Sequence, residues 1–317
     1  MRIWPLLSLL LLVFLFSCKK DIPVIAHQLE TGCSAKLNRF FFVNDSLAYL
    51  CGGDRYDRGV LLKSLDGGKS WKSDSIADKS LYTLFFFNAA EGIAAGYDAV
   101  YCETIDSARH FSKSNLSIYK PVNGLCFLNK NDGVLAFGNG FGNGGWAITH
   151  NGGADWNYVN DTLHAYTAAF FQSDSVVLVC GYGTIKCSHN GGTSFYSVVQ
   201  SGDFFQAMKF SDAMHGCAVG YFGGISRTVD GGQSWQVVKK SNTSFGTPDH
   251  LLGVDFFDAR HGVAVGESGV ILRTTDGGVH WDRIQSFTDA DLHDVHLYSA
   301  NSGIVAGSGG KVFMFEL

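Results

Sequence analysis

The sequence predicts an all-β fold: a seven-bladed β-propeller with four-stranded blades, closed by its N-terminal strand. Three observations support this prediction. A short motif recurs six times, each copy ends at an aromatic residue, and these residues are spaced 40, 45, 39, 40 and 46 residues apart. A period of about 40–45 residues is typical of one propeller blade. Each period holds several short apolar runs, and one strand-like run at the N-terminus belongs to no complete repeat.

Each period shows the pattern of four short strands. The cleanest copy, residues 251–281, has three apolar runs separated by glycines, and a more polar run follows the aromatic residue, as at 235–238. Apolar runs punctuated by glycine indicate antiparallel strands. The expected inner strands lie near Phe40–Val43, Leu81–Phe86, Val122–Leu128, Tyr166–Phe171, Phe205–Phe210, Leu252–Phe257 and Leu292–Leu297.

The two ends of the chain are expected to complete one blade together. The seventh unit stops at its third strand, Lys311–Leu317, whereas the run Val24–Leu29 has no unit of its own. Pairing these two runs removes the exposed sheet edges that an open ring would leave. Residues 24–317 are therefore assigned to one propeller.

The first residues have the pattern of a targeting segment. The apolar run Ile3–Phe16 follows Met1-Arg2 and is too short for a hydrocarbon core of ~30 Å, so residues 1–17 are predicted to be a cleaved signal peptide. The ending Leu15–Cys18 resembles a bacterial lipobox, which implies a lipid on Cys18 and a tether over residues 18–23. The expected location is the bacterial envelope. Lys19 favours the outer membrane by analogy, with the periplasmic or surface side left open.

Neither the composition nor the motifs of the mature sequence indicate binding of nucleic acid or of a cofactor. Residues 18–317 carry 23 basic and 29 acidic side chains without a basic stripe, which argues against nucleic acid. The glycine-rich segment 138–145 lacks the Lys-Ser/Thr of a phosphate loop and is expected to be an enlarged hairpin loop. His215 and His261 occupy one repeat position and are expected to be turn residues, so no metal site is predicted. Whether Cys180 and Cys187 form a disulfide is left open.

The recurring motif has the form Ser/Thr-x-Asp-x-Gly-x-x-Trp and resembles the Asp-box, also called the BNR repeat. Its chemistry is structural, because the hydroxyl and carboxylate bond the backbone of the turn between strands three and four. The copy at 104–111 lacks the glycines and is expected to have the least regular turn. The six copies are Ser64, Asp66 and Trp71; Thr104, Asp106 and Phe111; Thr149, Asn151 and Trp156; Ser188, Asn190 and Phe195; Thr228, Asp230 and Trp235; and Thr274, Asp276 and Trp281.

The whole unit, most clearly over 251–281 and 291–295, resembles the repeat of the photosystem II assembly/stability factor family. The resemblance implies a seven-bladed propeller that holds a protein partner during assembly and catalyses nothing. That family's basic patch does not carry over. Lys63, Arg227 and Arg273 precede their boxes, whereas the other three copies have Glu103, Ile148 and Cys187 there.

The alternative is a carbohydrate-active enzyme of sialidase type, or a glycan-binding protein, on the same fold. Sialidase chemistry needs three arginines around a carboxylate, and the early Arg-Ile-Pro signature is absent, since the corresponding place holds Asn38-Arg39-Phe40. No catalytic residue is therefore assigned.

One rim of the ring is expected to be the binding surface. In propellers, the loops between strands two and three share a rim with the connections between blades, and the boxes lie on the other rim. Aromatic rings next to cations on such a rim are typical of recognition surfaces. The candidate residues are Arg55, Tyr56, Arg58, Tyr97, Phe141, Tyr182, Tyr221, Phe222, His250, Glu267 and His293. The sequence thus predicts a lipid-anchored scaffold for a protein partner of unknown identity.

Overall fold

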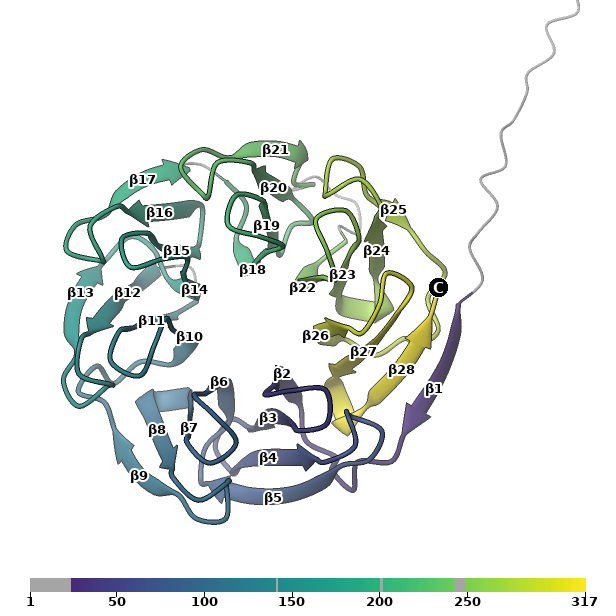
Figure 1. The fold of residues 1–317 in the computed structure, drawn as a ribbon, viewed down its shortest axis with the longest axis horizontal. Helices are drawn as coiled ribbons and strands as arrows, with labels where there is room; N and C mark the ends of the chain where they lie inside the picture. The colour runs from purple at the N-terminus through teal and green to yellow at the C-terminus, as the bar shows by residue number, and fades with distance from the viewer. Residues whose placement is uncertain (1–23, 141, 200–201, 243–248) are drawn as a thin grey trace, which may run out of the picture.

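The computed structural model describes residues 24–140, 142–199, 202–242 and 249–317, which form seven four-stranded sheets around a central channel (Figure 1). Neighbouring strands within each sheet are antiparallel and follow one another from the channel outward. The seven-bladed propeller predicted from the repeats is confirmed. Among the described residues, no helix has the length and apolar character needed to cross a membrane.

Each blade begins with an inner strand at the channel and ends with an outer strand at the edge of the ring. Blade 1 is β2 (Leu37–Phe42), β3 (Ala48–Asp54), β4 (Arg58–Ser64) and β5 (Lys72–Ala77). Blade 2 is β6 (Leu81–Phe86), β7 (Gly92–Gly96), β8 (Val100–Thr104) and β9 (Ser112–Asn115). Blade 3 is β10 (Val122–Phe127), β11 (Gly133–Asn139), β12 (Gly142–Thr149) and β13 (Asn157–Asp161). Blade 4 is β14 (Tyr166–Phe171), β15 (Val177–Gly181), β16 (Thr184–Ser188) and β17 (Tyr196–Val199).

Blade 5 is β18 (Phe205–Phe210), β19 (Gly216–Gly220), β20 (Ile225–Thr228) and β21 (Gln236–Lys239). Blade 6 is β22 (Leu251–Phe256), β23 (Gly262–Gly266), β24 (Ile271–Thr274) and β25 (Asp282–Arg283). Blade 7 is β26 (Leu292–Leu297), β27 (Ser302–Gly307), β28 (Val312–Glu316) and β1 (Ile25–Leu29). Three short 3-10 turns link second and third strands: η1 (Tyr97–Ala99), η2 (Glu267–Gly269) and η3 (Ser308–Gly310).

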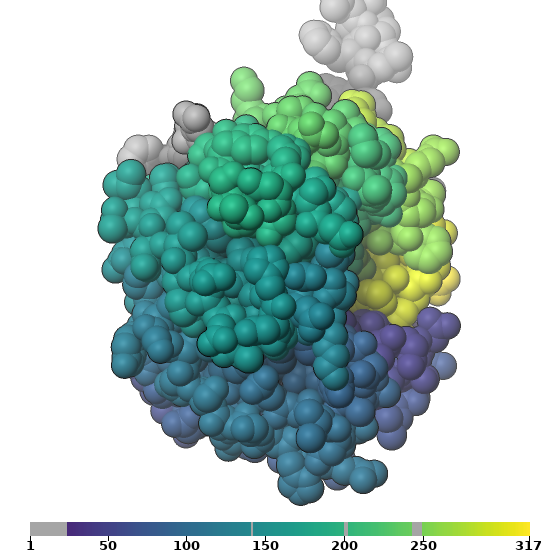
Figure 2. Space-filling view, turned by 60° about the vertical axis from the view of Figure 1, so that its left-hand side comes forward, coloured from purple at the N-terminus to yellow at the C-terminus, as the bar shows by residue number. Residues whose placement is uncertain are grey.

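The N-terminal strand closes the ring, as the sequence predicts. β1 pairs with β28 in an antiparallel register that places Ile25 opposite Glu316 and Leu29 opposite Val312. Figure 1 shows β1 on the outer edge of blade 7, and in Figure 2 the purple N-terminal residues adjoin the yellow C-terminal ones. Because η3 precedes β28 on one side of the ring, Ile25 lies on the opposite side, beside the end of β28.

The hydrophobic core is divided among the seams between neighbouring blades. One cluster joins Tyr49 and Leu61 of blade 1 to Leu84 and Phe86 of blade 2, and the rings of Tyr49 and Phe86 stack with centroids 3.8 Å apart. The aromatic residue of each box packs in such a cluster; Trp71 and Trp156 are 9% exposed and the other four are half-buried. Burial of each ring is worth about 1.5–3 kcal/mol, so the boxes tie blades together.

The hydrogen bonds of the box recur in all six copies. The Ser or Thr hydroxyl donates to the Asp or Asn oxygen two residues later, over 2.7–3.1 Å. It also accepts a bond from the backbone N–H four residues on, at 2.8 Å from Gly68 in the first box. The Asp66 carboxylate accepts bonds from the Ser70 hydroxyl and N–H, and these lower the pKa of Asp66 to about 2. Asn151 keeps the backbone bond without a charge.

The box at 104–111 keeps the hydrogen bonds of the other copies without their glycines, because Ser107 and Ala108 adopt left-handed φ angles of 65° and 61°. Its turn still differs most from the others, as expected, since the second glycine of the other copies has a φ of 85–92°. One local expectation was wrong. The segment 138–145 does not form an enlarged loop. β11 and β12 continue into it and pair as far as Asn139 opposite Gly142, because glycines at φ of 156° and 157° bend the hairpin without ending it.

The seven described cysteines are free. Cys187 lies opposite Leu178 and Cys180 opposite Ile185, so the register does not bring the two thiols face to face.

Candidate functional site

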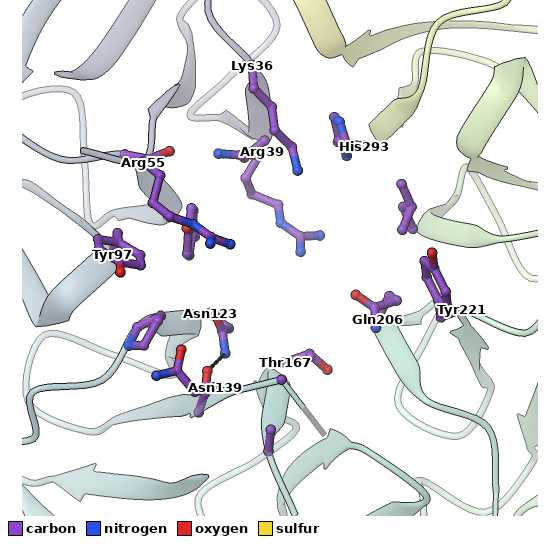
Figure 3. Close-up of a pocket in the computed structure, with 18 of the residues that line it drawn as sticks. Lys36, Arg39, Arg55, Tyr97, Asn123, Asn139, Thr167, Gln206, Tyr221 and His293 are labelled. Carbon is purple, nitrogen blue, oxygen red and sulfur yellow. Dashed lines mark hydrogen bonds between the residues drawn. The ribbon is translucent and has the colours of Figure 1, made fainter. Parts of the chain in front are cut away.

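A cavity of about 560 Å³ opens at one mouth of the central channel, and residues from all seven blades line it (Figure 3). It is surrounded by loops between second and third strands, such as Asn139 and Glu267, and by connections between blades, such as Pro121. We call this side of the ring the channel-mouth face. The opposite side, which carries the Asp-boxes, is called the box face.

A β-bulge in every inner strand supplies the wall of the cavity. The register between the first and second strand of each blade shifts at the second residue of the inner strand. Such a bulge leaves one residue outside the ladder and re-aims its side chain. The seven bulged residues all line the cavity: Asn38, Tyr82, Asn123, Thr167, Gln206, Leu252 and His293.

Three of these bulged side chains also bond the next blade. Asn38 Nδ2 donates to the Leu81 carbonyl at 2.7 Å, Asn123 Nδ2 to the Tyr166 carbonyl at 2.8 Å, and Thr167 Oγ1 to the Phe205 carbonyl at 2.5 Å. Each acceptor is the first residue of the neighbouring inner strand. The ring of bulges therefore joins blades as well as lining the cavity.

Three cations from blade 1 and the connection before it enter the cavity. Figure 3 shows Lys36, Arg39 and Arg55 extending toward its centre. Arg39 pairs with the buried Asp294 at 3.4 Å. The Arg55 guanidinium lies 5.4 Å from the centre of the Tyr97 ring, within cation–π range. No carboxylate in the described part of the chain forms an ion pair with Lys36 or Arg55.

Desolvation and neighbouring charges determine the protonation states of the ionisable groups in the cavity. Desolvation lowers the pKa of Lys36, although Asp291 and Glu267 oppose the effect. Desolvation, with help from the nearby Lys36, lowers the pKa of His293 to about 3, so His293 is neutral at pH 7. Its Nε2 lies 3.1 Å from Ser308 Oγ. The formal charges on the cavity wall are thus three cations against Glu267.

A second charged group lies deeper in the channel wall. The buried Asp255 of blade 6 pairs with Lys209 at 2.9 Å and with His296 at 3.2 Å, and its carboxylate accepts the Leu297 N–H. Burial raises the pKa of Asp255, but the attraction of Lys209 and His296 outweighs it and brings the pKa to about 2. These groups satisfy one another, and they join blades 5, 6 and 7.

Five of the eleven predicted rim residues line the cavity: Arg55, Tyr97, Tyr221, Glu267 and His293. Four others lie beside it on the channel-mouth face. The Tyr97 hydroxyl donates to that of Tyr56 at 2.8 Å, the Tyr182 ring packs edge-on against Phe204, and Phe222 and His250 pack against Tyr221. Arg58 pairs with Asp54 at 3.3 Å instead of facing the cavity. Phe141 lies outside the described residues.

Sequence reasoning missed most of the cavity wall. It found His293 from the start of an inner strand, and the same repeat position would have given the other six bulged residues. Arg39 was also missed, because strict alternation along a strand does not place residues 38 and 39 on one side, whereas the bulge at Asn38 does. Lys36 was missed because it lies in the connection before β2.

The two histidines that share one repeat position on the box face each bond a nearby carboxylate. His215 Nδ1 lies 2.9 Å from Asp212 and His261 Nδ1 lies 2.9 Å from Asp258. The described residues contain no cluster of three or more potential metal ligands.

Comparison with known proteins supports the resemblance found in the repeats. The family model for the photosynthesis system II assembly factor YCF48 matches residues 197–285, which run from the end of blade 4 to blade 6. This matched stretch carries YCF48-like repeats, within a chain whose fold is a seven-bladed propeller. None of the curated proteins matches it significantly.

Solved propeller structures share the fold of this chain. A YCF48 bound to D1 peptide superposes with a TM-score of 0.70 at 15% identity, covering 94% of this chain and 98% of the other. YCF48 from Cyanidioschyzon merolae gives a TM-score of 0.70 at 18% identity, covering 92% and 98%. The WD40 β-propeller domain of Doa1 gives 0.66 at 15% identity, covering 92% and 95%. At these identities the likeness concerns the fold, which proteins of different function share.

Proposed function

We propose that this protein is a non-catalytic scaffold of the bacterial envelope that binds a protein partner on its channel-mouth face. The observation that carries the proposal is a set of exposed apolar side chains around the cavity. Tyr56 is 75% exposed, Tyr119 80%, Leu163 72% and Tyr182 38%. All four lie on loops of the channel-mouth face. Tyrosine is enriched at protein interfaces because its ring buries a large area and its hydroxyl still forms a hydrogen bond.

The comparisons support a protein as the partner. The matching family is named for an assembly factor, and one solved YCF48 has a D1 peptide bound. That peptide is the partner of that protein. What we transfer to this chain is the mode of action, in which a propeller holds another polypeptide.

The attachment point of the predicted lipid tether supports the choice of face. Residues 18–23 span at most about 20 Å when fully extended, at ~3.3–3.6 Å per residue. They join the propeller next to Ile25, which lies on the box-face side of blade 7. With a lipid on Cys18, the box face is held near the membrane and the channel-mouth face is directed away from it, where a partner has access.

The proposal is tested by capturing partners from envelope membranes with the full-length, lipid-modified protein. Substituting Tyr56→Ser and Tyr182→Ser together should lower recovery of a discrete partner at least tenfold. The matched control is Leu65→Ser with Ile105→Ser, two box-face residues that are 72% and 81% exposed. Equal loss in both double variants, or in neither, would contradict binding through the channel-mouth face.

The anchor is tested separately by mass spectrometry of the mature N-terminus. We expect the chain to begin at Cys18 with acyl groups attached. Retention of residues before Cys18, or an unmodified Cys18, would remove the anchor from the proposal and leave the binding face to the capture experiment.

A further inference from the structure

The cavity presents an unusual distribution of hydrogen-bonding groups. The side-chain N–H groups of Asn38 and Asn123 are engaged by backbone carbonyls of the ring, and Gln206 Nε2 donates to the Phe204 carbonyl at 3.3 Å. Within the described part of the chain, the amide oxygens of these three residues accept no hydrogen bond. These three side chains therefore offer acceptors to the cavity, which suit a ligand that brings its own donors.

The cationic wall offers the complementary chemistry. Lys36 Nζ has no hydrogen-bond or ion-pair partner among the described residues, and Arg55 is supported by the Tyr97 ring and by a hydrogen bond to the Tyr82 hydroxyl rather than by a carboxylate. Lys36 is an exposed residue, yet partial desolvation at the cavity lowers its pKa against the attraction of Asp291 and Glu267. A carboxylate placed between Lys36 and Arg55 would favour the charged form of Lys36 and form charge-assisted hydrogen bonds with both side chains.

The shape of the cavity favours a compact ligand. Since all seven blades contribute to its wall, it is a bowl on the axis of the ring rather than a groove that runs off to one side. Its volume of about 560 Å³ lies within the ~300–1,000 Å³ typical of small-molecule sites. The rings of Tyr82, Tyr97 and Tyr221 line it as well and supply flat surfaces for packing.

We propose that this cavity binds a sugar acid, a uronic-acid mono- or oligosaccharide whose carboxylate lies between Lys36 and Arg55. Its hydroxyl groups donate to the amide oxygens of Asn38, Asn123 and Gln206. Arg39 contributes less, because Asp294 already neutralises it at 3.4 Å. This binding site is independent of the protein-binding role proposed above, which rests on the exposed residues outside the cavity.

The test is calorimetric titration of the full-length lipid-modified protein in detergent with trigalacturonate. The matched probes are the neutral galactose trisaccharide and the peptide tetraglutamate. We expect trigalacturonate to bind and the other two to bind at least tenfold more weakly. Lys36→Ala and Arg55→Ala should each weaken trigalacturonate binding about tenfold, and the double variant should abolish it.

The matched control is Arg58→Ala. Arg58 is a cation on the same hairpin as Arg55, but it pairs with Asp54 and does not line the cavity. It should leave binding unchanged, and unchanged melting temperatures show that all variants fold. The proposal is overturned if trigalacturonate does not bind, if the double variant binds it as well as wild type, or if tetraglutamate binds more tightly with the same dependence on Lys36 and Arg55. The last result would indicate that the cavity takes an acidic peptide.

Discussion

Deleting the N-terminal strand tests how the ring is held closed. The five residue pairs between β1 and β28 imply about five backbone hydrogen bonds, since an antiparallel ladder averages one bond per pair. At ~0.5–1.5 kcal/mol net for each bond, the ladder is worth roughly 3–7 kcal/mol. The half-buried Leu29 adds about 1 kcal/mol, and the entropy of ordering the strand opposes both gains. Deletion of residues 21–30 should therefore cost about 3 kcal/mol.

Such a loss corresponds to a fall in melting temperature of about 6–12 °C, at ~2–4 °C per kcal/mol. Denaturant unfolding and amide hydrogen exchange are the assays, with a protein lacking only residues 1–20 as the control. Because β1 links blade 7 to blade 1, exchange should accelerate in the seams of all blades and not in β28 alone. Should the deletion prevent folding, Leu29→Ala provides a milder change, expected to cost about 1 kcal/mol. A loss below 1 kcal/mol for the deletion, or faster exchange confined to β28, would refute closure by this strand.

Three further predictions concern the boxes. Trp235→Ala should lower the free energy of unfolding, measured by denaturant, by about 3–5 kcal/mol, because it leaves a cavity beside Phe210. The control Arg55→Ala, at an exposed residue, should lower it by less than ~0.5 kcal/mol. Equal small losses would contradict the structural role of the box. Ser107→Gly should raise stability by about 0.5–1 kcal/mol by relieving a left-handed φ of 65°, and no gain in melting temperature would argue against strain there. The folded pKa of Asp66, about 2, lies below its unfolded value, so its contribution is complete above pH 4 and is lost toward pH 2. Asp66→Asn should make the fall in melting temperature between pH 4 and pH 2 shallower, and identical pH profiles would exclude this source of acid sensitivity.

Much of the fold was predictable from the sequence because each sequence repeat corresponds to one four-stranded blade. Each box encodes a turn by its hydroxyl, carboxylate and aromatic residue, and four inner strands were predicted at the residues where the structure has them, among them Leu81–Phe86 and Tyr166–Phe171. Closure was predictable because one strand was missing at one end and one was in excess at the other. The left-handed conformation of Ser107 was not, because nothing in the local sequence shows that a serine is held in a glycine conformation.

The candidate site was predictable only in part. Loop residues such as Tyr97 and Glu267 were found, because propeller loops of one kind share a face. The cationic wall was not, since Lys36 lies in the connection before an inner strand and Arg39 reaches the cavity through a bulge that hydrophobic alternation does not reveal. The acceptor role of Asn38 and Asn123 was not predictable either. It arises because their side-chain N–H groups donate to backbone carbonyls of the next blade, and a contact between blades cannot be read from local sequence.

Site-specific photo-cross-linking in intact cells tests the central claim most directly, that partners bind the channel-mouth face. A photoreactive phenylalanine replaces Tyr56 in one protein and Leu65 in another, two residues that are 75% and 72% exposed on opposite faces of the ring. We expect a discrete protein adduct from position 56 and none from position 65. A discrete protein adduct from position 65 alone, or from neither position, would contradict it.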